Sequence, residues 1–442
     1  MTTRHFPDRA GPSGEDTRRH PASYYAATLD TDIAAPRLEQ DTTADVCVIG
    51  GGFTGLGAAL ALARAGKSVR LVEAGPIGWG ASGRNGGQVH LGWNKDQQWL
   101  AERLGEPAAR RLWDVALAAR AFLDTLIDSD PDRCDFRAGH IHADHKARYV
   151  ALTHEHVRFM REAYGHEALT PLSRDAMRAM VDSPAYHGGS LDMAGGHLHP
   201  LKLVRAMARL AVAAGARLHG HSPARSITPT PDGWAVATPL GTIRAGQVLV
   251  AGGGYAKGLL GEIDARVLPI NNYIATTEPL DPVLAARLIA GGHSVSDSRF
   301  VVHYFRVTPD HRLLFGGGET YGYRFPRDIA GFVRPHLERI YPQLAGVPLA
   351  HAWGGTLAIT PYRLPCAREV RPGLWSLSGY SGLGVVLAPF LGAALGEAMS
   401  GRGNAAFDCL RLLPAPRFPG GRWLRWPTLV AAMSFFALRD RI

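Results

Sequence analysis

The sequence has few cysteines, and none of them is placed to pair locally. Among its 442 residues, the thiols are Cys47, Cys134, Cys366 and Cys409, with no C-x-x-C pair and no close spacing. This pattern argues against a disulfide framework and against a thiolate zinc site, and it favours a reducing compartment. We therefore expect a cytoplasmic protein.

Runs of like charge are also missing. The net charge is +9, but lysine supplies only 5 of the 48 basic residues, and the arginines are scattered along the chain. A nucleic-acid-binding arm would concentrate its basic residues in one stretch. We expect no nucleic-acid partner.

Long apolar runs are absent as well. Residues 1–20 mix charged residues with Pro and Gly and lack the apolar segment of a signal peptide, so we expect a disordered tail. The apolar run Thr428–Leu438 is too short to span a bilayer. We interpret it as a helix docked on the fold, with a peripheral membrane contact as the alternative. We expect no stable membrane insertion.

The histidines do not indicate a metal site. Five of them gather in one stretch of the chain: His140, His142, His145, His154 and His156. Their spacing suits no tight tetrahedral site, and no thiolate accompanies them. We predict that no metal is bound.

What the sequence does have is a glycine-rich unit near its N-terminus, Asp45–Glu73. Its pattern predicts a buried strand, a helix and a second strand, at Ala44–Ile49, Thr54–Ala65 and Ser68–Val72. Between the first strand and the helix, Gly50, Gly52 and Gly55 have the spacing G-x-G-x-x-G.

This unit is typical of a dinucleotide-binding turn. Gly50 allows the sharp turn, Gly52 lets the backbone approach a pyrophosphate, and Gly55 lets the helix lie against the strands. The helix start offers N–H groups and partial positive charge to phosphates. Glu73 is placed to accept hydrogen bonds from a ribose 2′-OH, and no basic residue follows it directly, which favours FAD or NAD over NADP. A glycine-rich turn without a ligand is the alternative.

The rest of the chain alternates between helical and strand patterns. Residues 76–93 are rich in Gly, Ser and Asn, which predicts an extended loop. Helices are predicted at Leu100–Ile127, Ala147–Tyr164, Leu201–Ala214 and Ile329–Ile340, and one that ends at Met399. Strands are predicted at Arg217–His219, Trp234–Thr238, Thr242–Arg244, Gln247–Val250, Asn272–Thr277, Phe300–Val307, Arg312–Phe315 and Leu374–Leu377.

Three further motifs accompany the glycine turn. They are GASGRNGG at Gly80–Gly87, DMAGGHLHP at Asp192–Pro200 and GYSGLGV at Gly379–Val385. With them, the chain resembles the D-amino-acid-oxidase-like flavoproteins, and among these it looks closest to the γ-glutamylputrescine oxidoreductase family. The resemblance covers nearly everything from Ser23 onward.

The resemblance implies an α/β fold, with an FAD-binding Rossmann-like domain interleaved with an α+β substrate domain. We expect a disordered tail at 1–22 and a C-terminal extension at 406–442. The FAD-binding domain is expected in three parts, 23–93, 188–262 and 349–405. The substrate domain is expected in two parts, 94–187 and 263–348.

The resemblance also implies FAD, and it assigns the cofactor's parts to segments of the chain. The glycine turn and Glu73 would hold the ADP half, and Arg225 would contact the adenine through its backbone. Ser82 and Arg84 would donate hydrogen bonds near the flavin. The last helix would begin at its pyrimidine edge, where N–H groups stabilise the negative charge that reduction brings. The full expected set is Gly50, Gly52, Phe53, Thr54, Gly55, Glu73, Ala74, Ser82, Arg84, Asn85, Gly86, Gly87, Arg225, Gly252, Gly382, Leu383 and Gly384.

Two features set this chain apart within that resemblance. Leu383 stands where the family has histidine. Some relatives attach the flavin to a cysteine, but Cys366 lies several residues from the matching position, so we predict non-covalent FAD.

The implied reaction is oxidation of a γ-glutamylputrescine-like amine to an aldehyde, with release of ammonia and peroxide and with oxygen or another electron acceptor. The alternatives are oxidation of an N-methyl or D-amino acid, and an FAD-binding protein without turnover. We take His197, Tyr304 and Arg306 as candidate catalytic residues, the last two because they share a face of one strand. His199 has an open alternative as a helix cap.

Overall fold

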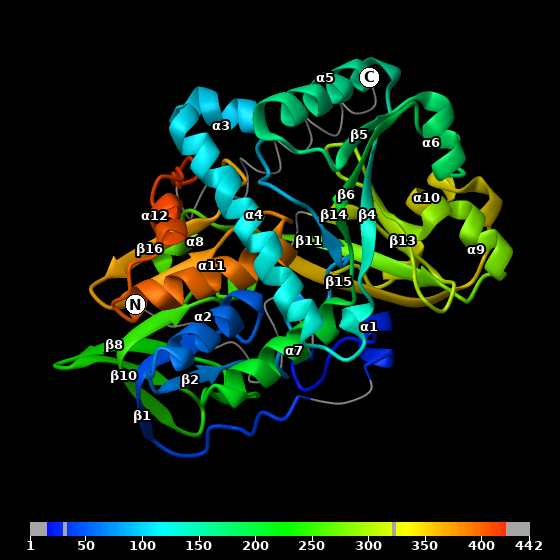
Figure 1. Ribbon diagram of the computed structural model, residues 1–442. Coiled ribbons are helices and arrows are strands. Elements are labelled where there is room, and N and C mark those ends of the chain that lie inside the picture. Colours follow the sequence, from blue (N-terminus) through cyan, green and yellow to red (C-terminus); the bar gives the residue numbers. More distant parts are fainter. Residues whose placement is uncertain (1–15, 30–32, 321–323, 421–442) are drawn as a thin grey trace.

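The computed structural model describes residues 16–29, 33–320 and 324–420, and two sheets organise this part of the chain (Figure 1). The first sheet has eight strands in the order β16-β17-β10-β1-β2-β7, with β9 on β10 and β8 on β9. The strands are β1 Thr42–Ile49, β2 Val69–Val72, β7 Arg217–His219, β8 Ser226–Thr230, β9 Gly233–Ala237, β10 Thr242–Val250, β16 Cys366–Arg371 and β17 Leu374–Ser378. The run β7-β2-β1-β10-β17 is parallel throughout.

The second sheet has nine strands in the order β15-β11-β14-β13-β12-β4-β6-β3, with β5 on β6. The strands are β3 Gln88–Val89, β4 Arg137–Ala143, β5 Leu169–Leu172, β6 Gly189–His197, β11 Leu268–Thr277, β12 Ser294–Asp297, β13 Tyr304–Val307, β14 Leu313–Thr320 and β15 Leu349–Ile359. Its strand pairs are antiparallel except for β12 with β4.

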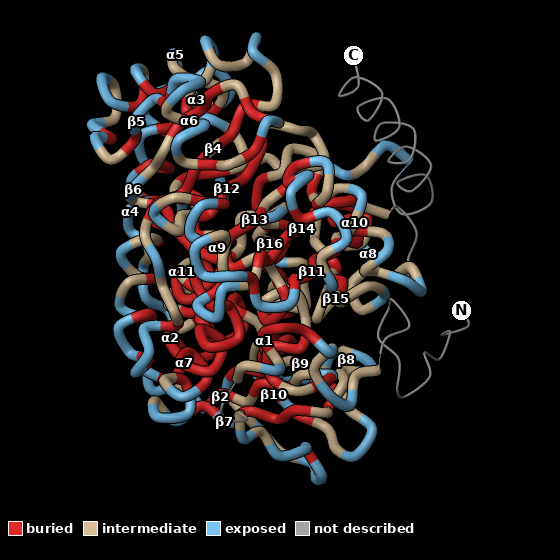
Figure 2. Tube along the Cα trace, turned by 90° about the vertical axis from the view of Figure 1, so that its right-hand side faces the viewer, coloured by how far each residue is buried: buried red, intermediate tan, exposed pale blue. Residues whose placement is uncertain are grey.

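Helices cover both sheets. They are α1 Tyr24–Ala27, α2 Phe53–Arg64, α3 Gln97–Leu104, α4 Glu106–Asp128, α5 Ala147–Tyr164, α6 Arg174–Met180, α7 Pro200–Ala213, α8 Gly261–Asp264, α9 Pro282–Leu288, α10 Ile329–Ile340, α11 Gly384–Met399 and α12 Ala405–Leu410. Figure 1 shows α2, α7 and α11 lying along the first sheet, and α9 and α10 at the outer side of the second. Figure 2 shows the buried residues gathered in the interior of the molecule and the exposed residues around its periphery.

Strand β1 is buried on both faces, as a central parallel strand should be. Val46 and Val48 belong to the large cluster that includes α2, and Cys47 and Ile49 belong to a second cluster on the opposite face. The strand–helix–strand unit predicted from the sequence is thereby confirmed, and Cys47 is a buried free thiol.

One predicted helix is in fact two. Helical periodicity runs through Leu100–Ile127, but the chain breaks between α3 and α4. Gly105 has φ +87°, a conformation that suits glycine, and Pro107 stands in the first turn of α4, where its missing N–H costs nothing.

Two predicted strands are in fact one. The sequence predicts Thr242–Arg244 as half of a hairpin and Gln247–Val250 as a separate strand, whereas β10 runs through both. Its first residues pair antiparallel with β9 and its last three pair parallel with β17. The strand predicted at Phe300–Val307 begins only at Tyr304.

The two sheets alternate along the chain, as the expected interleaving requires. By their pairing, β6 and β15 belong to the nine-stranded sheet, so a division by sheets would move the expected boundaries at 188 and 349. The seven-part division stays a proposal. Residues 16–22 are described, and Trp79 Nε1 donates to the carbonyl of Asp16 at 3.3 Å. Residues 1–15 and the run Thr428–Leu438 lie outside the described residues.

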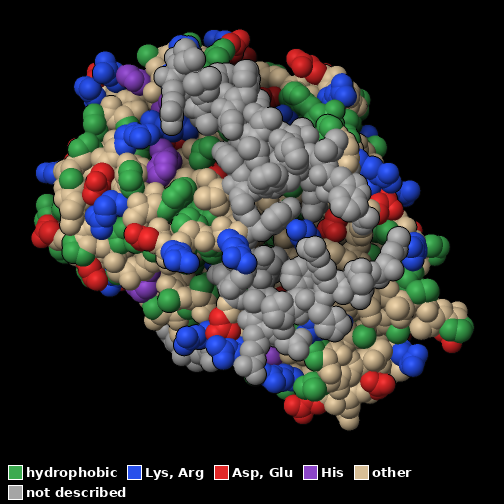
Figure 3. Space-filling model, turned by 180° about the vertical axis from the view of Figure 1, so that it is seen from behind, with side chains coloured by type: hydrophobic (Ala, Val, Ile, Leu, Met, Phe, Trp, Pro, Cys, Tyr) green, Lys and Arg blue, Asp and Glu red, His purple; other side chains and the backbone are tan. Residues whose placement is uncertain are grey.

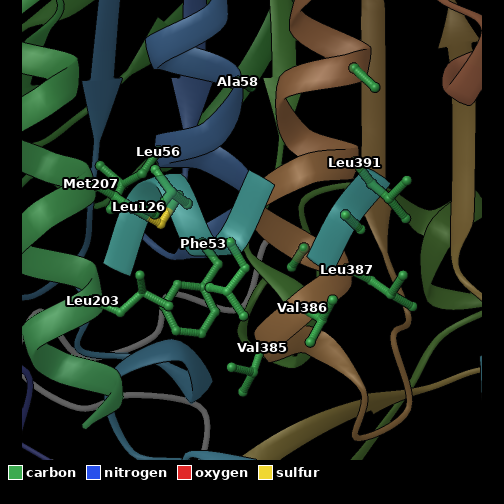
Figure 4. Close-up of a cluster of buried hydrophobic side chains, with 14 of the residues drawn as sticks. Phe53, Leu56, Ala58, Leu126, Leu203, Met207, Val385, Val386, Leu387 and Leu391 are labelled. Carbon is green, nitrogen blue, oxygen red and sulfur yellow. The ribbon is translucent and has the colours of Figure 1, made fainter. Parts of the chain in front are cut away.

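Helices α2 and α11 touch through their backbones. A Cβ on Gly57 would lie 2.2 Å from the carbonyl oxygen of Pro389, and one on Gly392 would lie 2.2 Å from that of Thr54. The two helices follow β1 and β17, which point the same way, so they are parallel. Figure 4 shows both of them, with α7 beside α2, beginning at the same end.

The surface carries its charges in a mixed pattern. On the face seen in Figure 3, the described Lys and Arg side chains are interspersed with Asp and Glu. Within the described ranges, no helix is long and apolar enough to cross a bilayer.

The α2–α11 contact predicts an unusual response to alanine. Gly57→Ala raises helix propensity, yet its methyl group has no room against Pro389, so we expect the free energy of unfolding to fall by about 1–3 kcal/mol. Thermal unfolding would measure this change. Gly403→Ala is the control, because nothing lies within 4 Å of the added Cβ. A wild-type melting temperature for Gly57→Ala would contradict close backbone packing.

Candidate active site

The turn between β1 and α2 brings backbone close to backbone. Gly50 has φ +112°, and a Cβ there would lie 2.8 Å from the carbonyl oxygen of Ala251. A Cβ on Gly55 would lie 1.9 Å from the carbonyl oxygen of Gly50, so the helix rests directly on the turn. Both positions require glycine on steric grounds.

The start of α2 is capped by a side chain from another segment. The hydroxyl of Ser82 accepts a hydrogen bond from Phe53 N–H at 2.9 Å. A Cβ on Gly52 would lie 2.6 Å from the same Ser82 oxygen. For the N–H groups of Gly52 and Thr54, the described residues supply no acceptor. N–H groups at a helix start without acceptors suit an anion such as a phosphate.

Glu73 lies beside this turn, at the end of β2. Its carboxylate accepts hydrogen bonds from Gly51 N–H at 2.7 Å and from Gly75 N–H at 3.3 Å. Burial raises the pKa of Glu73. A carboxylate has about four acceptor positions, so room remains for two ribose hydroxyls. The neighbouring Ala74 is exposed.

Arg84 is buried within the loop that follows, and its described hydrogen bonds go to backbone. Nε donates to the carbonyl of Trp79 at 2.8 Å and Nη1 to that of Gly354 at 2.9 Å. Its guanidinium lies 4.4 Å from the centre of the Trp79 ring. Arg84 thus fastens the loop to β15, and the expected donation to the flavin stays a prediction.

Asn85 shapes the same loop. Its amide nitrogen donates to the carbonyls of Ala81 and Ser82, and its oxygen accepts from Gly87 N–H at 2.8 Å. Gly87 has φ +73°, and a Cβ there would lie 2.0 Å from the carbonyl oxygen of Leu198. These hydrogen bonds and the close contact with Leu198 define the shape of the loop.

Tyr304 on β13 lies against this loop. A Cβ on Gly86 would lie 2.6 Å from the Tyr304 ring, and one on Gly316 would lie 2.0 Å from it. The hydroxyl donates to Asn272 Oδ1 at 2.5 Å. Burial raises the pKa of Tyr304 far above its usual range, so the phenol is neutral.

Arg306, two residues along β13, is 2% exposed. Nε donates to the carbonyl of Gly86 at 3.2 Å, and Nη2 donates to that of Leu198 at 3.3 Å and to the Tyr25 hydroxyl at 3.4 Å. The side chain therefore ties the Gly86 loop to the turn before α7. This geometry favours a structural role over capture of a substrate carboxylate.

His197 ends β6 and is 2% exposed. Its Nε2 donates to the carbonyl of Gly292 at 3.0 Å, while Nδ1 has no partner among the described residues. Burial, reinforced by the charge of Arg306, lowers the pKa of His197 to about 3. The ring is therefore neutral at ordinary pH, which argues against acid–base work. A role in the pocket stays a prediction.

His199 is a helix cap. Its Nδ1 accepts a hydrogen bond from Lys202 N–H at 3.1 Å, and its Nε2 lies 3.1 Å from the hydroxyl of Thr28. Both ring nitrogens of His199 thus contact other parts of the protein. Of the two alternatives for this residue, the structure agrees with the helix cap.

The start of α11 is a tight turn held from two sides. Gly382 has φ +104° with open space around it, and Leu383 is the half-buried cap before Gly384. Asn94 Nδ2 donates a hydrogen bond to the carbonyl of Tyr380 at 2.8 Å. The hydroxyl of Tyr380 lies 2.8 Å from the hydroxyl of Thr54, near the start of α2. The starts of α2 and α11 are thus directly linked.

The two remaining expected contacts, Gly252 and Arg225, lie in different places, and Gly252 is beside the turn, since a Cβ on Gly50 would lie 3.1 Å from its nitrogen. Gly252 follows β10, and a Cβ there would lie 2.8 Å from Ala256 Cβ. Arg225 is exposed, and its N–H donates to the carbonyl of Ala237 at 2.7 Å.

These residues fit FAD. The unaccepted N–H groups at the start of α2 suit phosphates, Glu73 keeps acceptor capacity for a ribose, and α11 aims a second helix start at the same edge of the sheet. Among the described residues, no group of three or more His, Cys, Asp or Glu could hold a metal ion.

Two polar residues near Tyr304 escaped the sequence analysis. Asn272 on β11 receives the Tyr304 hydrogen bond, and Glu319 on β14 is paired directly with Asn272. The signal that could have pointed to them is the run Gly316-Gly317-Gly318 before Glu319, because consecutive glycines in a strand often mark a bulge.

Comparison with known proteins agrees with this geometry. The family described as FAD dependent oxidoreductase matches residues 45–398. The chain is 40% identical to the probable oxidoreductase OrdL of Rhizobium meliloti, over 95% of this chain and 97% of that protein. It is 36% identical to the gamma-glutamylputrescine oxidoreductase of Escherichia coli, over 96% of this chain and 99% of that protein.

Among solved structures, the glycine oxidase of Geobacillus kaustophilus superimposes with a TM-score of 0.69 and 21% identity, covering 82% of this chain and 96% of that one. The similarity confirms the expected D-amino-acid-oxidase-like fold, with its Rossmann-like part and its interleaved second sheet.

The geometry of Arg306 predicts a loss of stability on truncation. Arg306→Met leaves the carbonyl of the buried Leu198 and that of the half-buried Gly86 without their donor, so we expect the free energy of unfolding to fall by about 1–3 kcal/mol. Thermal unfolding tests this, with the exposed Arg158→Met as control. An unchanged melting temperature together with a raised KM would instead indicate a substrate anchor.

Proposed function

Because the chain belongs to the family of FAD-dependent oxidoreductases, we propose that it oxidises γ-glutamylputrescine or a similar N-acylated diamine at its primary amine. The near full-length identity to an E. coli protein named gamma-glutamylputrescine oxidoreductase supports this substrate class. The products would be an aldehyde and ammonia, and peroxide where oxygen is the electron acceptor.

The cofactor in this proposal is FAD, bound without a covalent link. The start of α2 and Glu73 would hold the pyrophosphate and the ribose, and the Ser82–Gly87 loop would lie along the flavin. Bound FAD supplies the acceptor for a hydride equivalent that leaves the carbon next to the amine. Cys366 is a buried free thiol whose pKa burial raises, which supports non-covalent binding because attachment needs a reactive thiolate.

The observation that carries the proposal is the meeting of three features at one place. The starts of α2 and α11 lie at the same end of the parallel sheet, and the Gly86 loop there is covered by Tyr304 from the second sheet. This arrangement offers positive helix ends, close backbone and a neutral aromatic wall. Positioning and electrostatics of this kind are what amine oxidation asks of the protein.

Two of the candidate catalytic side chains beside this place are uncharged. Tyr304 and His197 are both neutral at ordinary pH because of burial. They would orient the amine and exclude water. The proposal includes a cytoplasmic location, which the four buried free cysteines support.

A first prediction tests the glycine turn. We expect wild-type protein to purify yellow, and Gly52→Val to lose most of its FAD because a side chain there blocks the pyrophosphate. The structure adds a second cause, since the same side chain would strike Ser82. The double variant Gly52→Ala with Ser82→Ala removes that clash. If flavin absorbance shows full FAD in the double variant but not in Gly52→Ala alone, the clash and not the pyrophosphate explains the glycine.

A second prediction tests the substrate class. In anaerobic stopped-flow experiments, γ-glutamylputrescine or N-acetylputrescine should bleach the flavin at least tenfold faster than sarcosine or D-alanine. The measured quantity is the loss of flavin absorbance. Faster bleaching by sarcosine or D-alanine would reject the amine class and leave the FAD site and the fold unaffected.

A further inference from the structure

Three residues form a row across neighbouring strands of the nine-stranded sheet. Asn272 on β11 is paired directly with Gly355 on β15 and with Glu319 on β14. Directly opposed residues of antiparallel strands point to the same face. A Cβ on Gly355 would lie 3.2 Å from Arg84 Cδ, so this face is the one that the Ser82–Gly87 loop covers. Glu319 points to the same side.

A bulge sets this direction. The register of β14 on β11 shifts between Gly316 and Glu319, so that β14 has one residue more than its partner. Gly318, inside the bulge, has φ +81°, and its carbonyl accepts a hydrogen bond from Asn272 Nδ2 at 3.2 Å. Because of the extra residue, Glu319 shares a face with Gly316, on which the Tyr304 ring lies.

The carboxylate of Glu319 is left without a matching group. Among the described residues it takes part in no hydrogen bond and no ion pair, although the Arg363 guanidinium and Tyr304 lie near enough to interact electrostatically. Burial raises the pKa of Glu319 to about 7. Glu319 is half-buried, and a half-buried carboxylate without a donor attracts a cation more strongly than one in open water does.

We propose that Glu319 binds the ammonium group of the amine substrate. The proposal rests on the function proposed above, which places a primary amine beside the Gly86 loop, and it adds the residue that selects a cation there. A carboxylate at this point attracts an alkylammonium group and repels the carboxylate of an amino acid presented the same way round. Glu319 would therefore decide between amines and amino acids.

Binding to the photoreduced holoenzyme under anaerobic conditions tests the proposal, because the reduced enzyme has no means of oxidising the amine. Calorimetry would compare N-acetylputrescine with 4-acetamidobutan-1-ol, in which a hydroxyl replaces the ammonium group. Wild type should bind the amine at least tenfold more tightly. In Glu319→Gln that preference should disappear, with unchanged flavin content. Glu278→Gln, at an exposed carboxylate directly after β11 that pairs with Arg312, should keep it.

The pH dependence of wild type gives a second readout that needs no variant. The affinity for N-acetylputrescine should fall as the pH falls through about 7, since a protonated Glu319 no longer attracts the cation. Of the groups that the structure places near it, the Tyr304 phenol stays neutral across this range, and Arg363 contributes a guanidinium. The alcohol should bind independently of pH.

Equal affinity of wild type for amine and alcohol, or no measurable binding of the amine, would overturn the proposal. A preference retained by Glu319→Gln would also overturn it. These results are separate from turnover: a chain that oxidises amines without needing Glu319 keeps its proposed function. If no amine reduces the flavin, but Glu319→Gln removes the cation preference of wild type, the proposed function fails and the ammonium site stands.

Discussion

The backbone contact between α2 and α11 is the constraint on which the candidate site depends. Gly57 and Gly392 let each helix rest on a carbonyl of the other, closer than side chains of ordinary size would permit. The helices run parallel because they follow β1 and β17, which are themselves parallel. The N-terminal ends of both helix dipoles, which are positive, therefore lie at one edge of the sheet. A hydrogen bond between the Thr54 and Tyr380 hydroxyls links these two ends. The phosphate binding proposed for one helix start and the charge stabilisation proposed for the other would then be properties of a single unit.

The part of the fold that could be predicted from sequence is the part whose causes are local. The strand, the glycine turn and the helix after it follow from apolar runs and from positions where only glycine fits, so Ala44–Ile49 and Thr54–Ala65 were found within a few residues. The continuity of β10 and the bulge before Glu319 depend on which strands lie alongside. The apolar periodicity of one segment does not show which strand pairs with it. These two features can therefore be seen only in the assembled sheets.

The candidate site shows the same division. The sequence and its resemblance pointed to segments that the fold brings together: the glycine turn, the Ser82–Gly87 loop and Tyr304. They did not reveal which groups these side chains contact. Ser82 caps α2, His199 caps α7, and Arg306 donates to carbonyls. The residue type determines which hydrogen bonds a side chain can donate or accept, whereas tertiary packing determines which group is its partner.

This distribution of contacts bears on how substrate choice is encoded. Around Gly86, the phenol of Tyr304 and the imidazole of His197 are neutral, and the donors of Arg306 face backbone. Among the described residues, Glu319 on the neighbouring strand β14 is a carboxylate with no hydrogen bond and no ion pair. The turn that suits a dinucleotide is part of the fold of a whole family of FAD-dependent oxidoreductases, so it cannot by itself distinguish one amine from another. Discrimination has to come from side chains that the second sheet aims at the same place. A one-residue bulge in β14 is enough to aim one of them, and such a change leaves the cofactor-binding half of the molecule as it was.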